Sequence, residues 1–341
     1  MKDIRAVVGV DIAKHVFQLH EVSKETGEIT SVRLKRKTFL AHFANRPTCL
    51  IGMEACGGAQ HWARKLVALG HEVRLLPALQ VKAFVSGNKN DMADARAIWM
   101  AVQQPGVRTA AIKTEAQQAV LAMHRIRQQL VKFRTAQINA LRGLLTEYGE
   151  VMPLGRSGIA RRLPGILANL ADRLPAVLVD TLREQFARIG RLDEEVVEIE
   201  RRLRDWYRQD DACRRLAEVP GVGLLTATAV VAAVGDAKTF KSGREFAAWL
   251  GLVPCQTGTG GRVKLLGISK RGDTYLRTLL IHGARSVLTH SKSPPEWIVK
   301  LVKRRPINVA IVAMANKTAR TLWALLAHGQ LYQREHNSSP A

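Results

Sequence analysis

The 341-residue sequence predicts an α/β domain over residues 1–111, a long helical region over residues 112–210 and a mostly helical domain over residues 211–331. In the first part, short apolar runs rich in β-branched residues alternate with polar turns, which is typical of strands. From residue 112 onward, turn residues become few and apolar residues recur at helical spacing. Hydrophobic residues make up 47% of the chain and charged residues 24%, as in an ordinary globular protein with a sizeable core.

The first part opens with three strand-like runs, followed by another apolar strand, an amphipathic helix and a further strand. In chain order these segments are residues 6–13, 16–23, 29–36, 48–55, 59–71 and 72–78. The pattern indicates a mixed α/β layer that begins with hairpin-linked strands. Ribonuclease H-like domains open in this order, whereas doubly wound folds usually begin with a β-α-β unit.

Two long amphipathic helices are expected in the middle of the chain. The apolar stripe predicted for the first helix consists of Val120, Met123, Leu130, Phe133, Ile138, Leu141 and Leu144. The second helix, around residues 191–207, carries opposite charges at helical spacing. Such helices either pack together within one chain or associate as a coiled coil between copies, and we slightly favour association.

The C-terminal part combines apolar helices with a glycine-rich loop. A Pro-Gly-Val-Gly sequence at residues 220–223 separates two apolar helices, which is the pattern of a helix-hairpin-helix motif, although a plain αα-hairpin looks similar. The loop spans residues 256–273, and further helical patterns cover 274–288 and 306–329. The tail, residues 332–341, is expected to be disordered.

The charge of the chain is unusual. Lys and Arg number 52 against 29 acidic residues, which gives a formal net charge of +23. An excess of this size favours binding to a polyanion, usually nucleic acid, over a merely basic or ribosome-associated protein. The four cysteines have no C-x-x-C spacing and indicate reduced thiols. With no signal peptide and no membrane-spanning segment in the sequence, we expect a cytoplasmic protein, associated with the bacterial nucleoid when it acts.

Four carboxylates stand out against this basic background. Asp11 lies inside an apolar run and Glu54 closes another, where burial disfavours a charge without a partner. Asp91 and Asp94 lie on one face at the start of a helix, where N-capping is the simpler interpretation. Gathered at one sheet edge, the four could hold two Mg²⁺ ions, which prefer hard oxygen ligands. Two such ions can assist the displacement at a phosphodiester.

Several motifs resemble those of a known family. "VGVDIAK", "GMEACG" and "NKNDMADARAIW" look like the three acidic motifs of DEDD-type insertion-sequence transposases, relatives of the Piv invertase. "EVPGVG", "FAAWLGLVP" and "GISKRGDTYLRTLLIHGAR" look like the second domain of that family. The resemblance covers nearly the whole chain. It implies a RuvC-like N-terminal domain with Asp11, Glu54, Asp91 and Asp94 as the acidic tetrad, and a recombinase guided by a structured non-coding RNA from its own element. Because the exchange of two duplexes requires several strand cuts in one complex, we also expect a homo-oligomer, either a dimer or a tetramer.

The same resemblance implies a hydroxyl nucleophile that would join covalently to a DNA phosphate. The family's serine lies a few residues after the "GLVP" segment and just before a glycine. Here no serine lies between Trp249 and Ser269, and Thr259, followed by Gly260, is the best match. Thr257 is the second candidate. The other interpretation of the loop is a phosphate-contacting segment with no covalent role.

Basic residues around this loop are candidates for nucleic-acid binding. They are Lys264, Lys270, Arg271, Arg277, Lys303, Arg304 and Arg305, and a solvated basic face is the alternative. His124, His282 and His290 are each isolated, so a surface or hydrogen-bonded core role is expected. Trp249 is expected in the core.

Other functions remain open at this point. A metal-dependent, structure-specific nuclease of the Holliday-junction type would need the carboxylates but not the hydroxyl. A sugar-kinase-like ATPase would need further glycine-rich phosphate motifs, which we do not find. A non-catalytic RNA-binding protein would account for the charge but leave Asp11 unexplained.

Overall fold

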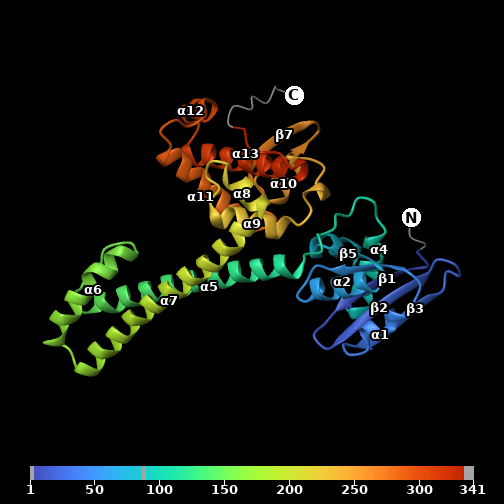
Figure 1. Ribbon diagram of the computed structural model, residues 1–341, viewed down its shortest axis with the longest axis horizontal. Helices are drawn as coiled ribbons and strands as arrows, with labels where there is room; N and C mark the ends of the chain where they lie inside the picture. Colours follow the sequence, from blue (N-terminus) through green and yellow to red (C-terminus); the bar gives the residue numbers. More distant parts are fainter. Residues whose placement is uncertain (1–3, 87–89, 334–341) are drawn as a thin grey trace. The chain divides into compact units, whose positions relative to one another are not determined.

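The computed structural model describes residues 4–86 and 90–333, and it divides the chain into two compact units between Glu115 and Ala116 (Figure 1). Residues 88 and 89 of the third acidic motif, and residues 334–341 of the expected tail, lie outside the described residues. The predicted helical region and C-terminal domain lie in the same unit, so their separation into two domains stays a prediction.

A mixed five-stranded sheet with the order β3-β2-β1-β4-β5 forms the centre of the first unit. Its strands are β1 (Ala6–Ile12), β2 (Val16–Ser23), β3 (Ile29–Lys35), β4 (Cys49–Glu54) and β5 (Glu72–Leu76). The hairpin-linked β1, β2 and β3 are antiparallel, whereas β4 runs parallel to both β1 and β5. The predicted mixed α/β layer, opened by three hairpin-linked strands, is confirmed.

Helices cover the two faces of this sheet differently. On one face, α1 (Phe39–Ala44) and α2 (Ala59–Ala68) pack against residues such as Val8 and Val10 of β1. On the other face lie α3 (Ala78–Val81), the 3₁₀ turn η1 (Lys82–Phe84) and α4 (Asp91–Val102). Because side chains alternate along a strand, the residues of β1 facing α4 are Val7, Gly9 and Asp11.

Two glycines let α4 lie directly on the sheet. A Cβ atom added at Gly9 would overlap the backbone oxygen of Ala95 and lie 2.5 Å from the backbone nitrogen of Trp99. A Cβ atom added at Gly52 would lie 2.8 Å from the Cβ of Val102. The backbone of α4 therefore lies on β1 at Gly9, and its side chains pack onto β4 at Gly52, so these two contacts fix the height and direction of the helix.

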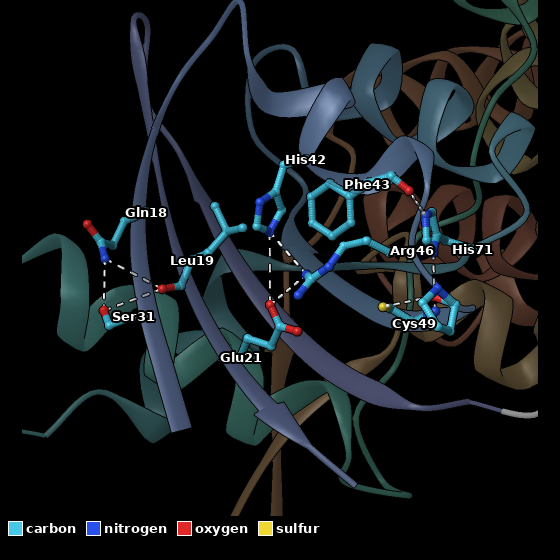
Figure 2. Close-up of polar contacts among 10 residues, drawn as sticks. Gln18, Leu19, Glu21, Ser31, His42, Phe43, Arg46, Cys49 and His71 are labelled. Carbon is cyan, nitrogen blue, oxygen red and sulfur yellow. Dashed lines mark hydrogen bonds and ion pairs between the residues drawn. The ribbon is translucent and has the colours of Figure 1, made fainter. Parts of the chain in front are cut away.

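On the opposite face, polar groups fasten α1 to the sheet (Figure 2). The buried His71 side chain accepts a hydrogen bond at Nδ1 from the Cys49 backbone N–H, at 3.2 Å, and donates from Nε2 to the Phe43 carbonyl, at 3.1 Å. Arg46 donates to Glu21 at 2.7 Å, and the His42 ring lies 3.1 Å from the Arg46 guanidinium. These contacts join the end of α1 to β2 and β4, far along the strands from Asp11.

In the second unit, α5 (Glu115–Glu147) and α7 (Ala176–Gln209) run antiparallel. The helix α6 (Arg156–Ala171) packs against the C-terminal end of α5 and the N-terminal half of α7. Arg127 pairs with Glu200 at 2.7 Å and Arg134 with Asp193 at 2.5 Å. Seven residues separate the partners on each helix, which is the spacing of a coiled-coil heptad. The two helices therefore pair within one chain, and association between copies stays a prediction.

The predicted apolar stripe of α5 needs a correction at two positions. Phe133 and Leu144 are 49% and 51% exposed, whereas Leu145 is buried. The contact positions on α5 advance by steps of three or four residues, and these steps reach 134 and 145 instead of 133 and 144. The helical period thus predicts that α5 has an apolar stripe, but the contacts with α7 decide which residues form it.

The C-terminal elements surround α13 (Ile307–His328), which packs against α8, α10, α11 and α12. They are α8 (Asp211–Ala217), α9 (Leu224–Val234), η2 (Ala237–Thr239), α10 (Gly243–Trp249), α11 (Thr274–His290), α12 (Glu296–Val302) and the hairpin of β6 (Pro254–Thr259) and β7 (Arg262–Ile268). Trp249 stacks on Phe246 at a centroid distance of 5.7 Å in this core, as expected.

The turn between α8 and α9 has a packing role. Gly221 has a φ of +84°, and a Cβ atom there would lie 2.7 Å from the backbone oxygen of Gly283 in α11. The close approach at this glycine is therefore to a neighbouring helix. A phosphate contact at the start of α9, as in a helix-hairpin-helix, stays a prediction.

His124 joins α5 to α9 and α11. The Thr228 hydroxyl donates to the Leu224 carbonyl at 2.7 Å, so it accepts from His124 Nε2–H at 3.0 Å. His124 Nδ1 then accepts from the Tyr275 hydroxyl at 2.9 Å. Burial, and next the charge of Arg127, lower the pKa of His124 to about 4. The expected hydrogen-bonded core histidine is found here, and His282 and His290 are exposed.

No helix within residues 4–86 and 90–333 is long and apolar enough to cross a bilayer.

We predict that Gly9→Ala destabilises the first unit by about 1–3 kcal/mol, the usual cost of forcing extra volume into a packed contact. The added methyl group must displace the α4 backbone, since the atoms it meets are not the ends of flexible side chains. Urea denaturation followed by tryptophan fluorescence measures the change. Gly106→Ala is the control, because nothing lies within 4 Å of a Cβ atom there. Equal stability of the two variants would contradict the account.

Candidate active site

Asp11 and Glu54 lie at the C-terminal ends of two adjacent parallel strands, Asp11 as the next-to-last residue of β1 and Glu54 as the last residue of β4. Val10 of β1 pairs with Met53 of β4, so Asp11 and Glu54, the next residues on each strand, emerge side by side at the same edge of the sheet. Both residues share the face of Gly9 and Gly52, because each lies two positions further along its strand. This is the face that α4 covers, so the two strand carboxylates are directed toward the start of that helix.

The start of α4 brings Asp91 and Asp94 to this edge. Asn90 caps the helix: its side-chain oxygen accepts from the Ala93 backbone N–H at 2.8 Å. The Asn90 carbonyl accepts from the Asp94 N–H at 3.0 Å. Neither aspartate is the N-cap residue, although both lie in the first turn, where the helix dipole favours negative charge. Asn90, and neither aspartate, therefore caps the helix, so the carboxylates of Asp91 and Asp94 are not used for capping and can bind another group.

The four carboxylates interact electrostatically. Partial burial, and after it the charges of Asp94, Asp91 and Glu54 in that order, together raise the pKa of Asp11 to about 6. Within the described part of the chain, none of the four forms an ion pair with a basic residue. In a chain with a net charge of +23, this edge of the sheet is thus a local concentration of uncompensated negative charge.

The donor chemistry of this edge fits a hard divalent cation. Carboxylate oxygens are the ligands that Mg²⁺ prefers, and a cation would offset the repulsion that raises the pKa of Asp11. The carboxylates lie apart from one another: among the described residues, no three His, Cys, Asp or Glu side chains are close enough together to hold a metal ion. Mutual repulsion of like charges favours such an open arrangement.

Other residues beneath α4 were not identified from the sequence. The His20 ring of β2 lies against Trp99 at a centroid distance of 5.3 Å, and burial together with the charge of Arg96 lowers the pKa of His20. A neutral ring therefore supports the helix behind the carboxylates. The alternating pattern of β2 places His20 on this face, but its partner Trp99 is not evident from the sequence.

Thr259 lies in the second unit, at the end of β6 next to the tip of the hairpin. Gly260 and Gly261 form a two-residue turn with φ values of +58° and +80°, as a type I′ turn requires. Thr259 and Thr257 are both exposed, and neither hydroxyl has a hydrogen-bond partner among the described residues. Ser269, the first serine after the hairpin, has a buried Oγ atom without a partner there. Thr259 and Thr257 are thus the accessible hydroxyls of this segment.

Most of the predicted nucleic-acid-binding cations lie on the surface. Those exposed are Lys264, Lys270, Arg271, Lys303, Arg304 and Arg305. Arg277 requires a correction, because it is buried and its guanidinium donates to the carbonyls of Leu250 and Arg271 at 2.9 and 2.8 Å. Its hydrogen bonds hold the segment before α11 in place, and its burial leaves little of the side chain exposed to a phosphate.

Comparison with known proteins gives the family. A model described as the transposase IS116/IS110/IS902 family matches residues 213–297, and a DEDD-type IS110 transposase model matches residues 8–150. A relative named "Probable family 20 transposase" from Pseudomonas aeruginosa is 45% identical over 96% of this chain and 98% of its own length. The chain belongs to the IS110/IS116 transposase family. It is an enzyme that cleaves and rejoins DNA strands.

Two further relatives extend the comparison. The transposase of insertion sequence element IS1111A from Coxiella burnetii is 42% identical to this transposase, over 98% of this chain and 92% of its own length. The pilin gene-inverting protein of Moraxella bovis is 23% identical over 81% of each chain. The resemblance to DEDD-type insertion-sequence transposases is confirmed.

We predict that, without divalent cations, Asp11→Asn makes the transposase more stable above pH 6. The pKa of Asp11 is higher in the folded than in the unfolded chain, so its contribution to stability is present below about pH 4 and is lost as the pH rises through 6. A shift of two units corresponds to about 3 kcal/mol, but Asp11 is only half-buried, so we expect a gain of about 1 kcal/mol at pH 7.

Thermal unfolding of both proteins between pH 4 and pH 8 measures this gain. Glu28→Gln, on the turn between β2 and β3, controls for the loss of one negative charge. A variant that is equally stable or less stable than the wild type at pH 7 would show that burial and the neighbouring carboxylates do not destabilise the charged form of Asp11.

Proposed function

We propose that this transposase cuts and rejoins DNA at the ends of its insertion sequence and at a target, through a covalent Thr259–phosphate intermediate. Asp11, Glu54, Asp91 and Asp94 would hold Mg²⁺, and a structured RNA encoded by the element would direct the protein to its DNA. The observation that carries the proposal is the convergence of four uncompensated carboxylates at one sheet edge of a chain in this family.

The carboxylates support a metal-assisted displacement at phosphorus. When bound, Mg²⁺ ions would offset the charge on the attacking and leaving oxygens of the phosphodiester. The protein residues supply the ligands and their positions. β1 and β4 carry Asp11 and Glu54, and the α4 contact at Gly9 sets the distance of Asp91 and Asp94 from them.

The proposed covalent step conserves the phosphodiester. The Thr259 Oγ atom forms a bond to phosphorus while one P–O bond to deoxyribose breaks. The hydroxyl proton passes to a base, and the departing sugar oxygen takes up a proton. Attack by a sugar hydroxyl then reverses the step on a new strand, so rejoining requires no external energy source.

A hydrolytic nuclease is the competing function, because the carboxylates alone can direct water to a phosphate. Hydrolysis leaves two ends and conserves no bond for rejoining. The accessible Thr259 hydroxyl next to a tight turn, which is the best match in this chain to the family's serine, favours the covalent route.

The charge and the reaction suggest the partners. A net charge of +23 and the exposed cations of the C-terminal unit suit two polyanions, DNA and a guide RNA. Exchange of two duplexes requires several strand cuts in one complex, so we propose a dimer or tetramer that acts at the nucleoid.

We predict that Thr259→Ala abolishes the covalent protein–DNA adduct, since no other group would replace the hydroxyl at that position. The assay uses labelled DNA that joins an element end to its flank, with Mg²⁺ and RNA transcribed from the element, run with and without protease. Thr257→Ala is the matched variant, two residues along the same strand, and should retain the adduct. An adduct of wild-type strength in Thr259→Ala would exclude this nucleophile, and cleavage by the wild type without any adduct would support hydrolysis.

We also predict that Asp11→Asn lowers DNA cleavage by at least about a hundredfold, as is usual when a group that acts in the transition state is removed. RNA binding should change little, because Asp11 contributes no positive charge. Cleavage rates and RNA affinity, measured on the same preparation, separate the two effects. Cleavage at the wild-type rate would remove Asp11 from the active site.

A further inference from the structure

The β6–β7 hairpin has two chemically different faces. Cross-strand partners point to the same side of a sheet. Thr259 pairs with Arg262, and Thr257 pairs with Lys264, so one face carries two hydroxyls and two cations. The partners on the other face are Gly258 with Val263 and Gln256 with Leu265, which carry no charge. The positive charge of the hairpin is therefore on the side of the candidate nucleophile.

The turn places Arg262 directly beside Thr259. With Gly260 and Gly261 as the two turn residues, Thr259 and Arg262 form the last cross-strand pair of the hairpin. The Cβ atoms of such pairs lie about 4.5–5.5 Å apart. An arginine side chain is long enough from there to reach an anion in contact with the Thr259 hydroxyl.

The charge of Arg262 is not compensated within the described part of the chain. Arg262 and Lys264 are both exposed, and neither forms an ion pair or a side-chain hydrogen bond with a described residue. Two hydroxyls beside two uncompensated cations form a surface suited to an anion. Arginine suits phosphate in particular, because it can donate two parallel N–H bonds to two phosphate oxygens.

We propose that Arg262 binds the phosphate that Thr259 attacks. The inference rests on the proposed function and names a catalytic residue for it. The guanidinium donates to the two non-bridging oxygens, turns the phosphorus toward the Thr259 Oγ atom and offsets negative charge as the Oγ–P bond forms and the P–O bond to the sugar breaks. Lys264, about 7 Å further along the strand, contacts a neighbouring phosphate and contributes to binding.

The test uses the full-length protein with RNA, Mg²⁺ and saturating DNA in single-turnover reactions. Arg262→Gln should slow adduct formation by about a hundredfold or more, as expected when a donor to the transition state is lost. Arg262→Lys should recover part of the rate, because it keeps the charge but not the paired donors.

Gln256→Ala, on the opposite face of the same hairpin, is the matched control and should leave the rate at saturating DNA within about threefold of the wild type. Lys264→Gln should weaken DNA binding and lower its salt dependence by about one counterion. An Arg262→Gln rate within about threefold of the wild type at saturating DNA would overturn the proposal.

A second measurement excludes a purely structural effect. DNA with a methylphosphonate at the cut phosphate lacks one of the oxygens that Arg262 is proposed to bind. The rate difference between the wild type and Arg262→Gln should shrink on this DNA, and should persist when the methylphosphonate is placed two phosphates away. An equal difference on all three DNAs would also overturn the proposal.

These outcomes separate this inference from the proposed function. If the wild type cuts DNA without forming an adduct, the Thr259 mechanism fails. The methylphosphonate comparison, applied to the cleavage rate, then still shows whether Arg262 contacts the cut phosphate. If the adduct forms and depends on Thr259 but not on Arg262, the proposed function stands and the present inference fails.

Discussion

The contact between α4 and the sheet at Gly9 is the constraint on which the acidic site depends. The sheet edge supplies Asp11 and Glu54, but two carboxylates at the ends of adjacent strands are half of the set. The other two come from a helix whose backbone lies on β1 without an intervening side chain. A side chain at this position would lift the start of α4 and carry Asp91 and Asp94 away from the strands. The electrostatic coupling of Asp11 to both aspartates shows that the contact brings them within range.

The two units meet different physical requirements. The first gathers negative charge at an edge where burial and repulsion make ionisation unfavourable without a cation. The second presents hydroxyls and uncompensated positive charge on an exposed hairpin. In the proposed reaction, the carboxylates would hold the metal ions and the cations would bind the phosphate oxygens, which would give a strongly basic protein a use for a cluster of acids.

The sequence predicts those features that depend on local periodicity. The strands and the unusual position of Asp11 follow from alternation and from the cost of a buried charge. Features that depend on residues distant in the sequence do not follow from local periodicity. The atoms that require a glycine at position 9 belong to Ala95 and Trp99, and the phase of the α5 stripe depends on α7. Arg277 resembles its exposed basic neighbours in sequence, but backbone carbonyls hold it inside. The four cysteines and ten histidines are irregularly spaced, so they do not imitate the spacing of a metal-binding motif.

The central claim is that the four carboxylates act as one site for divalent cations, and binding of Mn²⁺ tests it most directly. Electron paramagnetic resonance of Mn²⁺ titrated into the full-length protein measures the free ion, and hence the bound ion. We expect saturable binding to the wild type that Asp94→Asn weakens by about tenfold or more, because a ligand contributed by α4 is lost. Asp172→Asn, in the other unit, should bind as the wild type does. Equal binding by Asp94→Asn and the wild type, or no saturable binding at all, would contradict the account.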